Sequence, residues 1–211
     1  MTKTELHRRF DEMQTQYGAP ELNCIYGGGC ETEPNYCFVF MNPTGKNIAA
    51  QKSWNGIRTP WLGTKNIWKL FAEIGIISPE LNAEIQLKRP TDWTPEFCES
   101  VYNEITAHRA YITNLAKCTQ TDARHLHNSV YREYLELFSA EINLIKPKTI
   151  ILFGNTVSSI VLNKPITVGT NRRIEHTFQN IKTFTVHYPV GNGRFNLSKS
   201  TADLHHILNL G

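Results

Sequence analysis

The sequence lacks an apolar run long enough to cross a membrane, and its first residues, MTKTELHRRFDEMQ, lack the apolar core of a secretory signal. It also lacks a strong charge bias, because 22 Lys and Arg residues against 19 Asp and Glu residues leave a net charge of +3. Such a mildly basic chain is compatible with a polyanionic partner without requiring one. We therefore expect a soluble, intracellular protein that has no membrane partner.

Cysteine is scarce and is not spaced for metal binding. The five residues are Cys24, Cys30, Cys37, Cys98 and Cys118. An odd number of cysteines without a secretory signal argues against a disulfide framework. Cys24 and Cys30 do not form the Cys-x-x-Cys pair of common zinc and redox sites, and Cys37 fits a small core position. The cysteine pattern therefore argues against a metal site.

Familiar phosphate-binding and nucleophile motifs are also absent. The glycines at 27–29 are not followed by the Lys of a phosphate-binding loop. The segment GNTVSS at 154–159 lacks the Gly-x-Ser-x-Gly pattern of a nucleophile elbow. No internal repeat or low-complexity segment divides the 211 residues, a length that suits one α/β domain. We expect a single domain over residues 1–211.

Apolar runs and periodic patterns predict alternating strands and helices. Short apolar runs predict strands over 37–41, 110–115, 149–154 and 184–188. Helical patterns cover 3–17, 63–77, 94–107, 128–145, a short segment after Asn155, and 198–209. We expect Thr64 and Asn155 to cap the helices that follow them. The expected fold is α/β, a three-layer α/β/α sandwich with a central four-stranded, mostly parallel sheet.

Polar side chains follow the predicted strands where each strand ends. In FVFMNPTGKN, residues 38–47, an apolar strand delivers Asn42 into a tight turn, and Asn114 and His187 occupy the ends of two other strands. Because parallel strands end at the same edge of a sheet, these three side chains should share a cleft. An amide cannot abstract a proton, but it can orient a water or pair with a heterocycle, and a histidine can stabilise a departing anion. The set suits loss of a base-like group before water attacks, although asparagine at a strand end commonly satisfies only a turn.

Five blocks of the sequence resemble the uracil-DNA glycosylase superfamily, in the family's order. FMNPTG is similar to the Gly-x-Asn-Pro-Gly first motif of the mismatch-specific and single-strand-selective branches. RTPWLGTKNIWKLFAEIGI (58–76), YITNLAKCTQTDAR (111–124) and IILFGNTVSSIVL (150–162) resemble blocks of the iron–sulfur branch. HYPVGNGRFN (187–196) stands where the family has its second motif, His-Pro-Ser and a loop.

The resemblance implies a role for each position that matches the family's first motif and base pocket. Asn42, with Met41 and Pro43 beside it in the base pocket, would position the attacking water. Trp61 stands where the family has a phenylalanine that stacks on the flipped base, and any aromatic face can stack. Asn114 would bind the Watson–Crick edge of that base.

The second motif departs from the family's pattern. By resemblance, His187 would hydrogen-bond the carbonyl oxygen of the base and stabilise its anion, but Tyr188 separates it from Pro189. Either His187 or Tyr188 occupies the family histidine's place, and a phenol donates a hydrogen bond without supplying positive charge. Val190 replaces the family's serine. The iron–sulfur ligands do not transfer either, since only Cys118 matches, so we predict no cluster and no other cofactor.

The resemblance also implies contacts with DNA. The loop 190–196 would press on the minor groove, with Gly191 as a contact and Arg194 and Phe195 as wedges. The candidates for phosphate contacts are Arg58, Lys65, Lys117, Arg124 and Lys199. The implied partner is damaged or mismatched DNA, and we expect a monomer in the cytoplasm or at the nucleoid.

The leading expectation is a monofunctional DNA glycosylase that flips a deaminated base, uracil in the first place, and hydrolyses its N-glycosidic bond. Two alternatives remain open. The altered second motif fits a relative that binds nucleic acid but is weak or inactive in catalysis. A hydrolase of free nucleosides or nucleotides would need no DNA-binding loop, and its activity would not fall steeply with salt.

Overall fold

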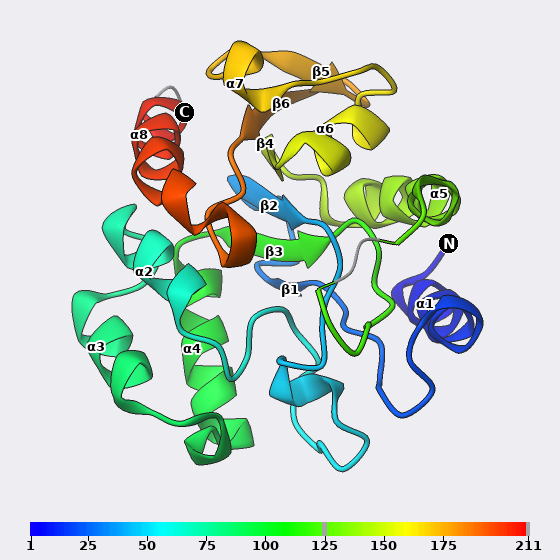
Figure 1. Cartoon of the computed structure of the whole chain (residues 1–211), viewed down its shortest axis with the longest axis vertical. Helices are drawn as coiled ribbons and strands as arrows, with labels where there is room; N and C mark the ends of the chain where they lie inside the picture. The colour runs from blue at the N-terminus through cyan, green and yellow to red at the C-terminus, as the bar shows by residue number, and fades with distance from the viewer. Residues whose placement is uncertain (124–125, 210–211) are drawn as a thin grey trace.

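A six-stranded sheet forms the centre of the computed structural model, and helices cover both of its faces (Figure 1). The structure describes residues 1–123 and 126–209, so the prediction for Arg124 lies outside the described residues. The strands are β1 (Gly28–Gly29), β2 (Tyr36–Phe40), β3 (Ala110–Asn114), β4 (Thr149–Phe153), β5 (His176–Phe178) and β6 (Ile181–Val186). Their order is β1-β3-β2-β4-β6-β5. The inner four are parallel, and β1 and β5 pair with their neighbours in the antiparallel sense.

The expectation of a four-stranded sheet is therefore wrong in number, although the α/β class and the parallel centre are confirmed. The two unexpected strands lie at the edges. β1 consists of two glycines, which carry no side chains from which a strand pattern is recognised. β5 is a three-residue strand whose side chains are exposed or half-buried, so it shows no apolar run.

The helices are α1 (Lys3–Tyr17), α2 (Asn66–Glu73), α3 (Pro79–Leu87), α4 (Pro95–Ala107), α5 (Asn128–Ile145), α6 (Asn155–Val161), α7 (Val168–Asn171) and α8 (Leu197–Leu208). Short 3-10 helices cover Ile48–Ala50, Pro90–Asp92 and Gly191–Asn196. Helix α3 is not among the expected helices, because Ile85 is its only buried residue and it presents no apolar face that a pattern would reveal. Among the described residues, no helix is long and apolar enough to cross a membrane.

Two predicted helix caps are wrong. The Thr64 hydroxyl donates to the Trp61 carbonyl at 2.6 Å instead of accepting from α2, which begins after Lys65. Gly154 is the N-cap of α6, and Asn155 instead accepts a hydrogen bond from the Val168 amide at 2.9 Å. Thr64 thus binds a loop carbonyl before α2, and Asn155 binds the first amide of α7, contacts that the sequence pattern does not distinguish from capping.

Alternating strand residues divide the core between the two faces of the sheet. Phe38 and Phe40 of β2 pack in the cluster beneath α2, α4 and α8. Cys37 and Val39 of the same strand pack in the cluster beneath α1, α5 and α6. This alternation follows from the two-residue period of a strand, and it produces the three layers visible in Figure 1.

Lys117 lies inside the second cluster and not on the surface. Its ammonium group donates to Glu141 Oε2 of α5 at 2.6 Å, to the Thr113 hydroxyl at 2.8 Å and to the Asn114 carbonyl. Glu141 Oε1 also accepts from the hydroxyls of Tyr111 and Thr113, at 3.0 and 2.9 Å. Because the Lys117 side chain is fully buried, the prediction that it contacts DNA phosphates is wrong.

We expect Lys117→Met to lower the free energy of unfolding by about 3–5 kcal/mol, because Glu141 would keep a buried charge without its partner. Adding Glu141→Gln should recover part of the loss, since the amide oxygen still accepts the two hydroxyl hydrogen bonds without a buried charge. The control is Lys3→Met, which removes an exposed ion pair with Glu31 and should cost less than about 1 kcal/mol. Urea unfolding compares the variants, and equal losses for Lys117→Met and Lys3→Met would contradict the expectation.

Candidate active site

A cleft of about 700 Å³ opens where the parallel strands end. Segments that follow β2, β3, β4 and β6 all reach it, as expected for the carboxyl edge of an open parallel sheet. The structure brings the following predicted site residues together in its lining: Met41, Asn42, Pro43, Trp61, Asn114, His187, Tyr188 and Gly191. Arg58, Arg194, Phe195 and the buried Lys117 do not line it.

Asn42 lies in the turn directly after β2 and is held by two hydrogen bonds. Its Nδ2 donates to the Pro43 carbonyl at 3.2 Å, and its Oδ1 accepts from the hydroxyl of Tyr131 on α5 at 2.7 Å. The amide keeps a second hydrogen on Nδ2 and a second lone pair on Oδ1 for a ligand. Because an amide does not take up a proton near neutral pH, Asn42 can orient a water but cannot deprotonate it.

Trp61 forms an aromatic wall of the cleft. Its backbone has a left-handed φ of 69°, which is uncommon for a bulky residue. The amide and hydroxyl of Thr64 both donate to its carbonyl, at 3.1 and 2.6 Å. The indole meets Phe40 edge-on, with ring centroids 5.0 Å apart. These contacts restrain Trp61, so it presents a fixed aromatic surface.

Asn114 ends β3 and is only 2% exposed. Lys117 binds its carbonyl, whereas its side-chain amide forms no hydrogen bond with any described residue. Its side chain lines the cleft, so water or a ligand can reach the amide there. Asn114 is therefore suited to pair with a polar heterocycle, since its amide donates and accepts at once.

His187 and Tyr188 follow β6, and both line the cleft. Burial, and then the positive charges of Lys199 and Arg172, lower the pKa of His187 below its usual value of 6.5. Burial raises the pKa of Tyr188 to about 12. Near neutral pH both residues are therefore neutral donors, and either can give a hydrogen bond to a carbonyl oxygen.

The loop of the second motif forms the 3-10 helix Gly191–Asn196. A Cβ on Gly193 would lie 2.0 Å from the Tyr188 carbonyl, so only glycine permits this close approach. Phe195 is 80% exposed, and the Arg194 guanidinium lies over its ring, 4.5 Å from the centroid. An exposed phenylalanine beside a cation suits insertion between bases, and the DNA contacts of this loop stay predictions.

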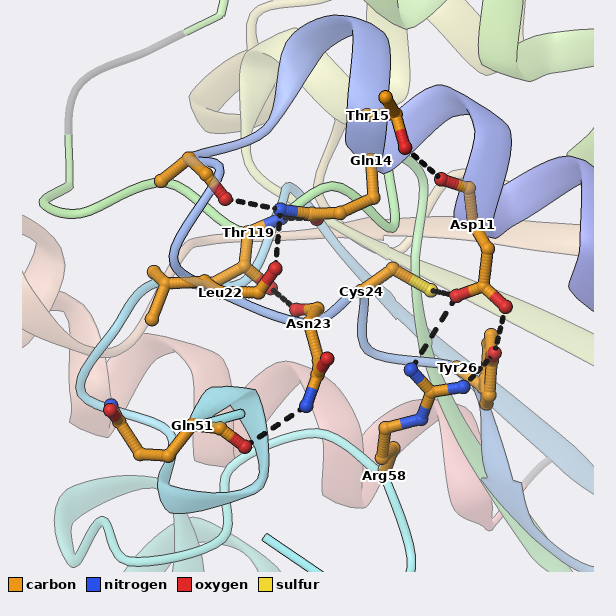
Figure 2. Close-up of polar contacts among 11 residues, drawn as sticks. Asp11, Gln14, Thr15, Leu22, Asn23, Cys24, Tyr26, Gln51, Arg58 and Thr119 are labelled. Carbon is orange, nitrogen blue, oxygen red and sulfur yellow. Dashed lines mark hydrogen bonds and ion pairs between the residues drawn. The ribbon is translucent and has the colours of Figure 1, made fainter. Parts of the chain in front are cut away.

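Arg58 is bound within a polar network that joins α1 to the chain around it (Figure 2). Its guanidinium lies over the Tyr26 ring, 4.3 Å from the centroid, and pairs with Asp11 at 3.4 Å. Asp11 also accepts from the Cys24 thiol at 3.3 Å and from the Tyr26 hydroxyl at 2.8 Å. A phosphate bound by Arg58 would therefore compete with these partners.

The same view shows how the segment after β3 is anchored (Figure 2). Gln14 of α1 accepts from the Thr119 amide at 2.7 Å and donates to the carbonyls of Ala19 and Leu22, at 2.9 and 3.1 Å. The Thr119 hydroxyl donates to the Asn23 carbonyl at 2.6 Å. These contacts fix the chain a few residues beyond Asn114.

Some residues at the cleft were not recognised from the sequence. Lys46 lines it beside the predicted Lys65, whose ammonium donates to the Gln86 carbonyl at 2.6 Å. Tyr131 fits the apolar periodicity of α5, so nothing in the pattern indicated a polar contact with Asn42. The phosphate roles of Lys65 and of the exposed Lys199 stay predictions.

All five cysteines are buried and unpaired. Burial raises the pKa of the Cys24, Cys37, Cys98 and Cys118 thiols. In the part of the chain that the structure describes, no three His, Cys, Asp or Glu side chains are grouped so that they could hold a metal ion. The thiols are core groups in this structure.

Comparison with known proteins identifies the family. A model of the uracil DNA glycosylase superfamily matches residues 27–208, a span that includes every predicted residue that lines the cleft. No curated protein matches the chain. The family match spans most of the sequence and coincides with the sheet and its cleft. The chain belongs to the uracil DNA glycosylase superfamily.

Proposed function

We propose that this protein is a monofunctional DNA glycosylase that flips a deaminated base, uracil in the first place, and hydrolyses its N-glycosidic bond. Superfamily membership supports DNA glycosylase activity in general. The observation that carries the specific proposal is the Asn114 amide, which forms no hydrogen bond with a described residue and lines the same cleft as the ring of Trp61. An amide that donates and accepts, together with an aromatic wall, suits a flipped pyrimidine.

The charge of the cleft also supports this reaction. Its described lining contains Lys46 and Lys65 but no Asp or Glu. A carboxylate would repel both the phosphates of DNA and a base that leaves as an anion. The cleft therefore favours negative charge in its substrate and in its leaving group.

The proposed reaction proceeds by early departure of the base. The bond between the sugar C1′ and the base nitrogen breaks, and its electron pair leaves with the base. Water then bonds to C1′ and loses a proton, which yields an abasic sugar and, after protonation, the free base. Asn42 would hold this water, and His187 or Tyr188 would donate to a carbonyl oxygen of the base anion. Because Asn42 takes no proton, leaving-group stabilisation supplies most of the rate.

The substrate is proposed to be damaged or mismatched DNA inside the cell, bound by a monomer. The exposed Arg194 and Phe195 support a contact with the DNA stack. Flipping costs least for bases that are mispaired or in single strands. We therefore expect these contexts to be preferred over a well-paired base.

A nucleic-acid-binding relative with weak or no catalysis is the second candidate. The second motif favours it, because no described residue hydrogen-bonds the side chain of His187 or Tyr188. In addition, a buried Val190 stands where the resemblance expects a serine. A donor that is not preorganised stabilises an anion less. Oligonucleotide binding without base release from uracil, hypoxanthine or xanthine substrates would select this candidate.

Asn42→Ala should slow release of uracil from an oligonucleotide by about 100-fold or more, because the attacking water loses its orientation. Binding of the oligonucleotide should hardly change. The matched control is Asn103→Ala, which removes an exposed amide on α4 and should leave both quantities unchanged. Full activity in Asn42→Ala would refute the proposed site.

Trp61→Phe should retain wild-type KM, whereas Trp61→Ala should raise KM by about 5- to 150-fold, since a stacked base contributes about 1–3 kcal/mol. None of the three side chains changes the demand for a positive φ, so the comparison isolates the ring. Steady-state base release from a uracil-containing oligonucleotide measures the effect. If the Phe and Ala variants behave alike, no base stacks on Trp61.

The rate of base release should be nearly constant from about pH 7 to about pH 9, because His187 stays neutral above its lowered pKa and Tyr188 stays protonated. His187 gains its charge only as pH falls through that lowered pKa, so a histidine-dependent change should appear only on the acid side of the usual value of 6.5. Single-turnover rates of wild type, His187→Ala and Tyr188→Phe provide the profiles. A wild-type rate that falls about tenfold per pH unit above neutrality would show that charged His187 is required.

A further inference from the structure

Tyr131 approaches the cleft from the helical layer behind the sheet. Its ring lies in the apolar cluster beneath α5, and the residue is fully buried. Its hydroxyl nevertheless donates to Asn42 Oδ1 at 2.7 Å, across 89 positions of sequence. Burial is the main cause that raises the pKa of Tyr131, so this hydroxyl keeps its proton throughout the neutral range.

The surroundings of Asn42 determine which way its amide points. The Pro43 carbonyl can only accept, so Nδ2 must be the atom on that side, 3.2 Å away. Oδ1 then lies on the side of Tyr131, whose hydroxyl must donate. The terminal torsion of asparagine has broad, shallow preferences. Hydrogen bonds therefore decide its value here. The bond from Tyr131, at 2.7 Å, is shorter than the bond to Pro43, so it restrains the amide more strongly.

We propose that Tyr131 is a positioning residue for base release, an inference that rests on the proposed function. It acts through Asn42 by fixing the orientation of the amide. One Nδ2 hydrogen and one Oδ1 lone pair then remain to hold the reacting water. Without Tyr131 the amide can rotate, so only a fraction of the molecules holds the water in the reactive orientation.

Helix α5 provides a matched control one turn away. Tyr134 is also fully buried in the same apolar cluster, but its hydroxyl lies beside Cys118 and forms no hydrogen bond with Asn42. Tyr131→Phe and Tyr134→Phe therefore remove the same atom from the same helix at similar depth. Only the first of these changes removes a contact with Asn42.

The kinetic test compares single-turnover base release from a uracil-containing single-stranded oligonucleotide. We expect Tyr131→Phe to lower the rate about tenfold with unchanged half-saturation, and Tyr134→Phe to match wild type. In the Asn42→Ala background, Tyr131→Phe should have no further effect, because the residue acts only through the amide. An equal loss in both phenylalanine variants, or a full further loss in the double variant, would overturn the proposal.

A second measurement needs no substrate. In ¹H–¹⁵N NMR spectra, the side-chain NH₂ signals that disappear in Asn42→Ala report on the amide. We expect Tyr131→Phe to shift or broaden them and Tyr134→Phe to leave them in place; unchanged signals in Tyr131→Phe overturn the contact.

If wild type releases no base, the proposed function fails while this readout still tests the contact. If Asn42→Ala is slow and Tyr131→Phe is as fast as wild type, only the positioning proposal fails.

Discussion

The candidate site depends most on the buried ion pair between Lys117 and Glu141. The Lys117 ammonium has three acceptors, and one of them is the carbonyl of Asn114. Such a pair adds little net stability compared with apolar residues of similar size, so its main effect here is to fix the position of the backbone at Asn114. Through the Asn114 carbonyl, Lys117 holds the backbone at the end of β3, where the strand reaches the cleft. Helix α5 thus supplies Glu141 in support of one asparagine and Tyr131 in support of the other.

Parallel topology explains why distant residues meet in this cleft. Phe40 and Asn114 are register partners, so Asn42 follows β2 two residues beyond the level at which β3 ends. The ends of β4 and β6 continue the same edge. The resulting lining offers amides, aromatic rings and lysines but no described carboxylate. These groups suit recognition of a base and stabilisation of an anion, and neutral His187 is the member of the described lining that can take up a proton near neutral pH.

Much of this arrangement was predictable because apolar patterns report burial. The helix over 128–145 and the inner strands are confirmed by the structure, since each buries a continuous or periodic apolar face. Local patterns do not report partners that are distant in sequence. Lys117 was expected to contact DNA phosphates at the surface. Its partner Glu141 lies 24 positions later in the sequence, and no local pattern indicates that the two charges pair. No sequence pattern indicated Tyr131, because its ring packs in the core and only its hydroxyl reaches Asn42.

A crystal structure of the Asn42→Ala protein with a uracil-containing single-stranded oligonucleotide would show whether the cleft receives a flipped base, because slow hydrolysis should preserve that base. We expect an unstacked uracil in the cleft, with its ring against Trp61 and its Watson–Crick edge on the Asn114 amide. A carbonyl oxygen of the base should point toward His187 or Tyr188. An oligonucleotide bound elsewhere, with the cleft empty of any base, would show that this cleft does not bind a flipped base.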